Sequence, residues 1–163
     1  NDPKQNVFIA AKDDVAGIKR RAKYASVYLV KDGDAVKSYI LPIKGYGLWS
    51  TLYGFLALES DAKTVVGLGY YEHAETPGLG GEVDNPSWKA KWIGKEVLGT
   101  DNQILIDVVK GAVDPASKNA INQVDGLSGA TLTSRGVENM LHYWLSEQGF
   151  APYLNKVRAT GGQ

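Results

Sequence analysis

The chain has 163 residues, of which 44% are apolar and 22% charged, the composition of one folded domain rather than of a disordered segment. Its 18 basic and 18 acidic residues balance, which argues against a nucleic-acid-binding protein. The absence of cysteine excludes disulfides and thiolate chemistry, and two histidines are too few for a zinc site built mainly from imidazole.

The first third of the chain predicts a polar helix followed by a hairpin. We expect the helix over residues 12–23. Residues 25–31 and 35–41 are rich in Val, Tyr, Ile and Leu and predict two strands. Asp32-Gly33 between them is a turn signal, because both positions tolerate positive φ. Pro42 is expected to end regular pairing, since proline cannot donate to a ladder.

Two glycine-rich loops flank a second predicted hairpin. Its strands are expected at residues 54–59 and 64–71, joined by a turn at 60–63. The preceding loop, residues 45–50, reads Gly-Tyr-Gly-Leu-Trp-Ser and carries two large aromatic side chains. The following loop, residues 75–81, reads Glu-Thr-Pro-Gly-Leu-Gly-Gly.

The second half of the chain predicts helices around one buried strand. Residues 86–93 favour a short helix that begins at proline, and residues 103–109 favour the strand. The clearest helix has one apolar face, formed by Val137, Met140, Leu141, Trp144 and Leu145. We expect Thr133 or Ser134 to cap its start and Gly149 to stop it. Hairpins followed by separate helices favour a single α+β domain spanning residues 1–163.

The segment before that last helix has the composition of an anion-binding site. Residues 128–134 hold four hydroxyl side chains, next to Gly126 and Gly129. The first turn of a helix presents unpaired N–H groups and the positive end of the helix dipole, and small residues let a phosphate approach them. The segment lacks the lysine of a Walker loop and the last glycine of a nucleophile elbow. A capped helix after a tight turn is the plainer alternative.

The full string of residues 125–131, Asp-Gly-Leu-Ser-Gly-Ala-Thr, is more specific. It resembles the flavinylation motif of FMN-binding domains (Asp-Gly-any-Ser/Thr-Gly-Ala-Thr) at every position. In that family a separate flavin transferase splits FAD and attaches FMN to the final threonine, here Thr131. Residues 75–80 look like the family's second flavin loop. Residues 45–50 point to the C subunits of sodium-translocating NADH:quinone oxidoreductases, whereas the related G subunits of Rnf complexes share the first two motifs and are the alternative.

The resemblance implies an electron carrier rather than a complete enzyme. It implies one FMN, bound covalently by a phosphoester, within a subunit of an ion-translocating oxidoreductase whose other membrane subunits deliver and remove electrons. No catalytic residue, metal site or nucleic-acid partner is expected. The family member has an N-terminal membrane helix that is missing here, since no run of about 20 apolar residues occurs. The domain is expected on the periplasmic side of a bacterial inner membrane.

Specific residues are predicted to hold the phosphate. A threonine hydroxyl is a poor nucleophile unaided, so the transferase is expected to activate Thr131. Ser128 and Thr133 are expected to donate hydrogen bonds to the phosphodiester. Gly129, Ala130 and Leu132 complete this part of the set, the first two by leaving room. Asp125 is assigned to turn stabilisation or to recognition by the transferase, because like charges repel.

The flavin ring needs a flat apolar surface and polar partners for its edge. Tyr46, Trp49 and Leu79 are the candidates for the surface, although core packing explains the two aromatics equally well. Glu75 and Thr76 are the candidates for the edge. Gly78 and Gly80 are assigned to the same loop, where a plain turn is the alternative.

Two other classes of function remain open. A hydrolase using Ser128 would need a carboxylate and either His73 or His142 to converge on that hydroxyl. A non-redox domain could use the glycine loops for a small ligand, and a deeply buried Thr131 would favour that alternative.

Overall fold

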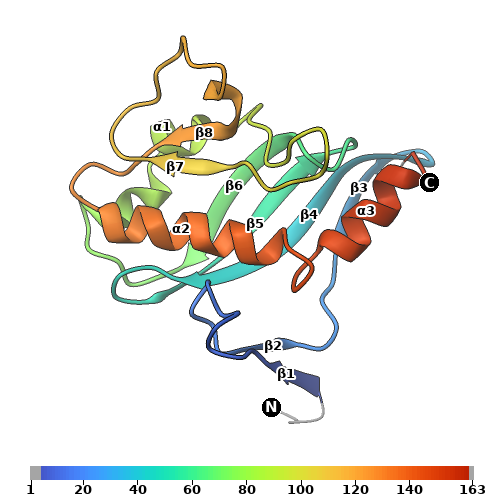
Figure 1. Cartoon of the computed structure of the whole chain (residues 1–163), viewed down its shortest axis with the longest axis horizontal. Coiled ribbons are helices and arrows are strands. Elements are labelled where there is room, and N and C mark those ends of the chain that lie inside the picture. Colours follow the sequence, from blue (N-terminus) through green and yellow to red (C-terminus); the bar gives the residue numbers. More distant parts are fainter. Residues whose placement is uncertain (1–4, 162–163) are drawn as a thin grey trace.

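A four-stranded antiparallel sheet forms the centre of the computed structural model, which describes residues 5–161 (Figure 1). The strand order is β3-β4-β5-β6, so each strand pairs with its neighbour in sequence. The strands are β3 (Tyr28–Asp32), β4 (Ala35–Tyr46), β5 (Thr51–Glu59) and β6 (Val65–Glu72). Both predicted hairpins are therefore present.

Two helices cover one face of this sheet (Figure 1). They are α2 (Thr131–Trp144) and α3 (Ala151–Ala159). Alternate residues of β4 and β5 point toward α2, as the period of a strand requires. The fully buried side chains of this layer include Leu41, Leu52, Leu56, Val137, Met140 and Leu141. The apolar face predicted for α2 is thus confirmed as core, and the fold is α+β.

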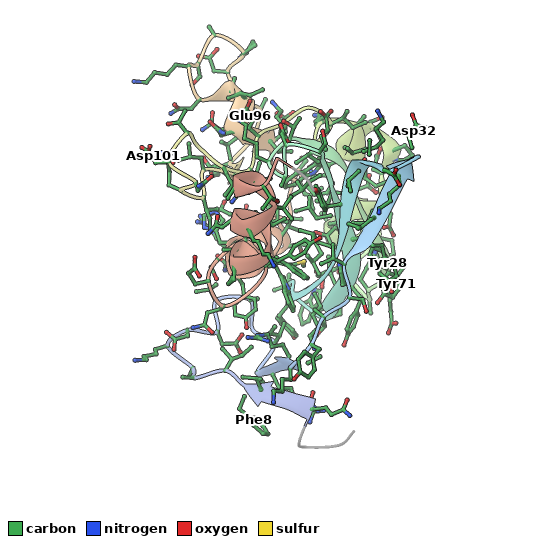
Figure 2. All side chains as sticks on the ribbon, turned by 90° about the vertical axis from the view of Figure 1, so that its right-hand side faces the viewer. Phe8, Tyr28, Asp32, Tyr71, Glu96 and Asp101 are labelled. Atoms are coloured by element: carbon green, nitrogen blue, oxygen red, sulfur yellow. The ribbon has the colours of Figure 1, made fainter. Side chains whose placement is uncertain are left out.

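The other face of the sheet is exposed and aromatic. Figure 2 shows Tyr28 and Tyr71 on the side of the sheet away from the helices. The Phe55 ring lies between them, with centroids 6.3 Å from Tyr28 and 5.5 Å from Tyr71. These separations fall in the range of favourable aromatic pairs, which stabilise a sheet face that no helix covers.

Short elements complete the chain. β1 (Asn6–Phe8) and β2 (Arg20–Ala22) form an antiparallel ribbon beside the main body, while β7 (Asp107–Val109) and β8 (Gln123–Asp125) pair in parallel. The remaining pieces are the 3-10 helices η2 (Gly80–Asp84) and η3 (Ala120–Asn122) and the helix α1 (Pro86–Ala90). Within residues 5–161, no helix has the length and apolar character needed to cross a membrane.

The predicted helix over residues 12–23 is wrong, and the reason is local. This segment consists of turns and strand β2. The Asp14 carboxylate accepts hydrogen bonds from the N–H groups of Ile18 and Lys19, at 2.9 and 2.7 Å, in competition with a helix. Gly17 and Lys19 both have positive φ, which a right-handed helix excludes.

Pro42 does not end pairing, as we expected it to do. Strand β4 continues to Tyr46, with Pro42 opposite Phe55 on β5. Strand β3 begins at Tyr28, opposite Ile40. Pro42 therefore lies past the end of β3, where no partner strand requires its missing N–H.

Three boundaries in the second half also differ from the sequence prediction. Only residues 107–109 of the expected strand at 103–109 pair in a ladder. Helix α2 begins at Thr131 rather than after Thr133 or Ser134, and neither hydroxyl caps it. It ends at Trp144, and Gly149 instead lies in the turn to α3, which the sequence analysis did not predict.

Gly136 sets the distance between α2 and the end of β4. A Cβ atom at this position would lie 2.4 Å from the Tyr46 carbonyl oxygen and 2.9 Å from the Gly47 Cα. Gly136→Ala should lower the free energy of unfolding by about 1–3 kcal/mol, because backbone rather than a flexible side chain has to move. Urea denaturation measures the change. Gly67→Ala is the matched control, since its Cβ would meet nothing within 4 Å; equal losses in both variants would contradict the prediction.

Candidate functional site

The start of helix α2 presents a free hydroxyl next to unpaired N–H groups. Thr131 is the first residue of the helix, and its side chain is exposed. Ala130 precedes it and supplies no side-chain cap. In the part of the chain that the structure describes, the N–H groups of Thr131, Leu132 and Thr133 find no acceptor. This is the geometry of an anion-binding helix terminus.

Two hydrogen bonds of the Ser134 hydroxyl fix the turn before α2, in which Ser128 is exposed. The Ser134 hydroxyl accepts from the N–H of Leu127 at 2.9 Å and donates to the carbonyl of Ala130 at 3.0 Å. Gly129 has a φ of 69°, a left-handed conformation that favours glycine. The side chains of Leu127 and Ala130 are consequently buried, while Ser128 is exposed.

Asp125 fixes the beginning of the same loop. Its Oδ1 accepts from the N–H of Val113 at 2.9 Å, its Oδ2 accepts from Lys91 Nζ, and its carbonyl accepts from Trp88 Nε1 at 2.8 Å. The hydrogen bond from Lys91 lowers the pKa of Asp125 below the ordinary value. Asp125 therefore stabilises the turn, one of the two roles proposed for it.

A cavity of about 390 Å³ lies beside the loop. One wall is the loop itself, including Ser128, Gly129 and Thr131. The lining also includes three cationic side chains, those of Lys91, Lys110 and Arg135, and one carboxylate, that of Asp125. The hydroxyl of Thr131 thus borders a recess whose charge favours an anion.

Glu75 joins this loop to the two glycine-rich loops. The carboxylate is buried and accepts from three successive N–H groups, those of Leu48, Trp49 and Ser50. It also accepts from the hydroxyls of Ser50, at 3.0 Å, and Thr133, at 2.7 Å. The Thr133 hydroxyl donates to Glu75 and is therefore not available to a phosphate, contrary to the prediction from the sequence. The backbone N–H of Thr133 remains free to donate to an anion.

Glycines allow this close approach. A Cβ at Gly47 would lie 2.8 Å from Glu75 Oε1, and a Cβ at Gly80 would lie 2.8 Å from Oε2. A Cβ at Gly80 would also lie 2.5 Å from the Thr133 hydroxyl. Gly78 has a φ of 75° within a turn whose Thr76 carbonyl accepts from Leu79 and Gly81. Three segments that are distant in sequence therefore meet at one place.

Large apolar side chains are exposed around this junction. Trp49, Leu79 and Leu132 are 67%, 43% and 61% exposed. Leu79 borders the loop of residues 125–130, since a Cβ at Gly129 would lie 3.0 Å from its Cδ2. Tyr46 lies apart from this group: it packs beside Gly17 and lines a separate recess with Lys19 and Lys44. Trp49 and Leu79 therefore lie on the loops joined by Glu75, whereas the Tyr46 side chain, at the end of β4, faces a different recess.

No hydrolase triad surrounds Ser128 in the described chain. His73 Nε2 lies 2.7 Å from an Asp84 oxygen, and its Nδ1 accepts from the N–H of Glu75. His142 Nε2 lies 2.7 Å from the Ile106 carbonyl. Both rings are engaged away from Ser128. Residues 5–161 also contain no group of three His, Asp or Glu side chains placed to hold a metal ion.

Two residues that hold the loop from outside could not be recognised in the sequence. Lys91 and Trp88 come from α1 and the turn that follows it, 34 and 37 residues before Asp125. Trp88 also packs edge to face on Trp92, with ring centroids 5.5 Å apart. Nothing in the spacing indicated that the Trp88 indole would donate to the motif.

Fold and site define an α+β domain that presents an exposed hydroxyl at an uncapped helix start, with two glycine-rich loops joined to that helix through Glu75. Residues 47–146 match the family described as FMN-binding domain. The chain belongs to this family, which confirms the resemblance seen in its motif.

Named relatives narrow the comparison. The C subunit of the Na(+)-translocating NADH-quinone reductase of Pseudomonas aeruginosa is 54% identical over 157 residues, which are 96% of this chain and 60% of the relative. Its counterpart in Vibrio vulnificus is 51% identical over 98% of this chain and 62% of the relative. The crystal structure of Shewanella oneidensis NqrC superposes with a TM-score of 0.88 at 37% identity, over 96% of this chain and 70% of that one. The chain thus spans about three fifths of the curated relatives it matches.

The ion pair of Asp125 predicts a pH-dependent stability. Because the folded pKa is lowered, the contribution of Asp125 is full above the unfolded pKa of about 3.9 and is lost as the pH falls through the folded pKa. Lys91 is half exposed, so Asp125→Asn should cost up to about 1 kcal/mol at pH 7 and progressively less as the pH falls below about 3.9. Urea denaturation across this range measures the difference.

The control for this prediction is Asp101→Asn. Asp101 is exposed on a surface loop, and its carboxylate has no partner among residues 5–161 (Figure 2). A stability difference for Asp125→Asn that stayed constant down to pH 2 would contradict the ion-pair interpretation.

Proposed function

We propose that this chain is the flavin-carrying part of the C subunit of a sodium-translocating NADH:quinone oxidoreductase, and that Thr131 bears its FMN through a phosphoester. The observation that carries the proposal is the position of Thr131, exposed at the first residue of α2 beside three unpaired N–H groups. The family match and the relatives at about 50% identity support the choice of cofactor and of complex.

The residues around Thr131 fit an FMN group. An attached phosphodiester carries about one negative charge, which an exposed helix start favours by roughly 0.3–1 kcal/mol. Ser128 is exposed next to it and can donate a further hydrogen bond. The exposed apolar surfaces of Trp49 and Leu79 suit the flat ring. Deep burial of Thr131, which would favour a non-redox ligand domain, does not occur.

Attachment requires a second enzyme. The Thr131 oxygen would form a bond to the FMN phosphorus of FAD while the bond from that phosphorus to the AMP oxygen breaks, and AMP leaves. The hydroxyl proton needs an acceptor, and no side chain in the described part of the chain makes a hydrogen bond to Thr131. A flavin transferase would therefore supply the base, and Thr131 would be its substrate.

The flavin supplies the electron-transfer chemistry, and the chain holds it in place. Other subunits of the complex would deliver and remove the electrons, and an N-terminal membrane helix of the kind that the resemblance implies would anchor the domain on the periplasmic side of the inner membrane. The G subunit of an Rnf-type complex is the alternative. Residues 45–50 and the names of the relatives favour the C subunit of the sodium-translocating complex.

The attachment site is tested by intact mass. The chain is co-expressed with a flavin transferase, denatured and weighed. We expect one FMN unit on the wild-type protein and none on Thr131→Ala, because the hydroxyl is the acceptor. Tandem mass spectrometry of the peptide over residues 125–135 locates the adduct.

Ser128→Thr is the matched control, since the motif accepts either hydroxyl residue at this position and the side chain is exposed in the same loop. It should retain the adduct at a similar yield. An unmodified wild-type protein in the presence of active transferase would refute covalent attachment, and a tandem mass spectrum that placed the wild-type adduct on residue 128 would move the acceptor to Ser128.

A further inference from the structure

Glu75 is a buried carboxylate with no cation beside it. Its residue is 5% exposed, and none of the ion pairs within residues 5–161 includes it. Burying an unpaired charge is unfavourable unless hydrogen bonds replace its hydration. Burial alone would raise the pKa of Glu75, but the Thr133 hydroxyl, the N–H groups of Trp49 and Leu48 and the Ser50 hydroxyl lower it. The side chain is consequently an anion in the folded protein.

The donors to this anion come from two segments far from it in sequence. Leu48, Trp49 and Ser50 lie 25 to 27 residues before Glu75, and Thr133 lies 58 residues after it. One segment carries the exposed indole of Trp49. The other is the first turn of α2, where Thr133 follows Thr131 by two residues. The carboxylate thus connects the predicted ring surface to the predicted attachment point.

We propose that Glu75 is the positioning residue of the flavin site: as a buried anion, it fixes the loop of Trp49 against the attachment helix and places a negative charge under the ring surface. This proposal rests on the proposed function. It differs from the earlier prediction for Glu75, in which the carboxylate itself would contact the ring edge. Both carboxylate oxygens accept bonds from protein donors instead.

The glycines of the two loops support this role. Gly47 lies next to one oxygen of the Glu75 carboxylate and Gly80 lies next to the other, and neither position has space for a Cβ atom. A Cβ atom at Gly47 would also lie 2.6 Å from Leu52 Cδ1, and one at Gly80 would lie 2.5 Å from the Thr133 hydroxyl, so the packing around Glu75 leaves no room for a side chain at either position. The hydrogen bonds from the two loops and from Thr133 hold the Glu75 carboxylate in one position. A negative charge held close to a flavin disfavours the addition of electrons to the flavin.

The first arm of the test needs no flavin. Amide hydrogen exchange of the unmodified chain is compared for wild type, Glu75→Gln and Glu72→Gln, a control that removes an exposed charge three residues away. The side-chain amide oxygen of the Glu75→Gln variant can still accept, but a hydrogen bond to a neutral acceptor is weaker than one to a charged carboxylate, so exchange at Trp49 and Ser50 should be about tenfold faster in this variant. Unchanged exchange at both amides would overturn the proposal. Equal acceleration in Glu72→Gln would overturn it as well.

The second arm uses the flavinylated chain. With the adduct mass retained, Glu75→Gln should lower the fluorescence anisotropy of the flavin and shift its midpoint potential to a more positive value, while Glu72→Gln leaves both near wild type. An unmoved potential would reduce Glu75 to a structural role and overturn the proposal. If the wild-type chain takes no flavin, the proposed function fails, and the exchange arm alone decides whether Glu75 holds the loops.

Variants with a single donor removed cover the case in which Glu75→Gln does not fold. Thr133→Val and Ser50→Ala each delete one hydroxyl donor and keep the carboxylate. Each should give an intermediate acceleration of exchange at Trp49, and no acceleration in either would overturn the proposal. Thr133→Val should leave the potential closer to wild type than any variant that removes the charge.

Discussion

The site depends on one requirement, that a buried anion must be surrounded by donors. No ion pair within residues 5–161 includes Glu75, and backbone N–H groups approach the carboxylate directly instead. Gly47 and Gly80 lie close to its two oxygens, where a Cβ atom at either position would come within 2.8 Å. The two glycine-rich loops are therefore shaped by a carboxylate inside the protein, and the surface they present to a ligand follows from that internal contact.

Helix α2 combines a rigid interior with an open beginning. Its apolar side packs on β4 and β5 and includes Val137, Met140 and Leu141, all fully buried. Gly136 brings its axis close to the Tyr46 backbone, and Thr133 ties its first turn to Glu75. Thr131 and Leu132, by contrast, face solvent. A group attached to Thr131 is consequently mounted on an element that cannot shift without disturbing the core.

The parts that could be predicted from the sequence are those whose causes are local. The first hairpin follows from strand-forming residues on either side of a turn at Asp32-Gly33, the second from strand-forming residues around a turn at residues 60–63, and the string ending at Thr131 needs no knowledge of distant residues. The donors of Glu75 could not be inferred, because no periodicity links positions 25 to 58 residues apart. The helix expected at residues 12–23 failed for the opposite reason: the short-range bonds of Asp14 outweigh the propensity of the segment.

The loop before α2 is braced at both ends and open in the middle. Asp125 is held by Lys91 and Val113 at one end, and the first turn of α2 is held through Thr133 at the other. Between these anchors Ser128 and Thr131 are exposed. A modifying enzyme can therefore reach the Thr131 hydroxyl without breaking a hydrogen bond of the folded chain. The contacts of Asp125 and Thr133 leave this hydroxyl accessible, and the link through Glu75 also fixes its position relative to Trp49. The same contacts would therefore suit a substrate for modification and, after modification, a rigid carrier of the attached group.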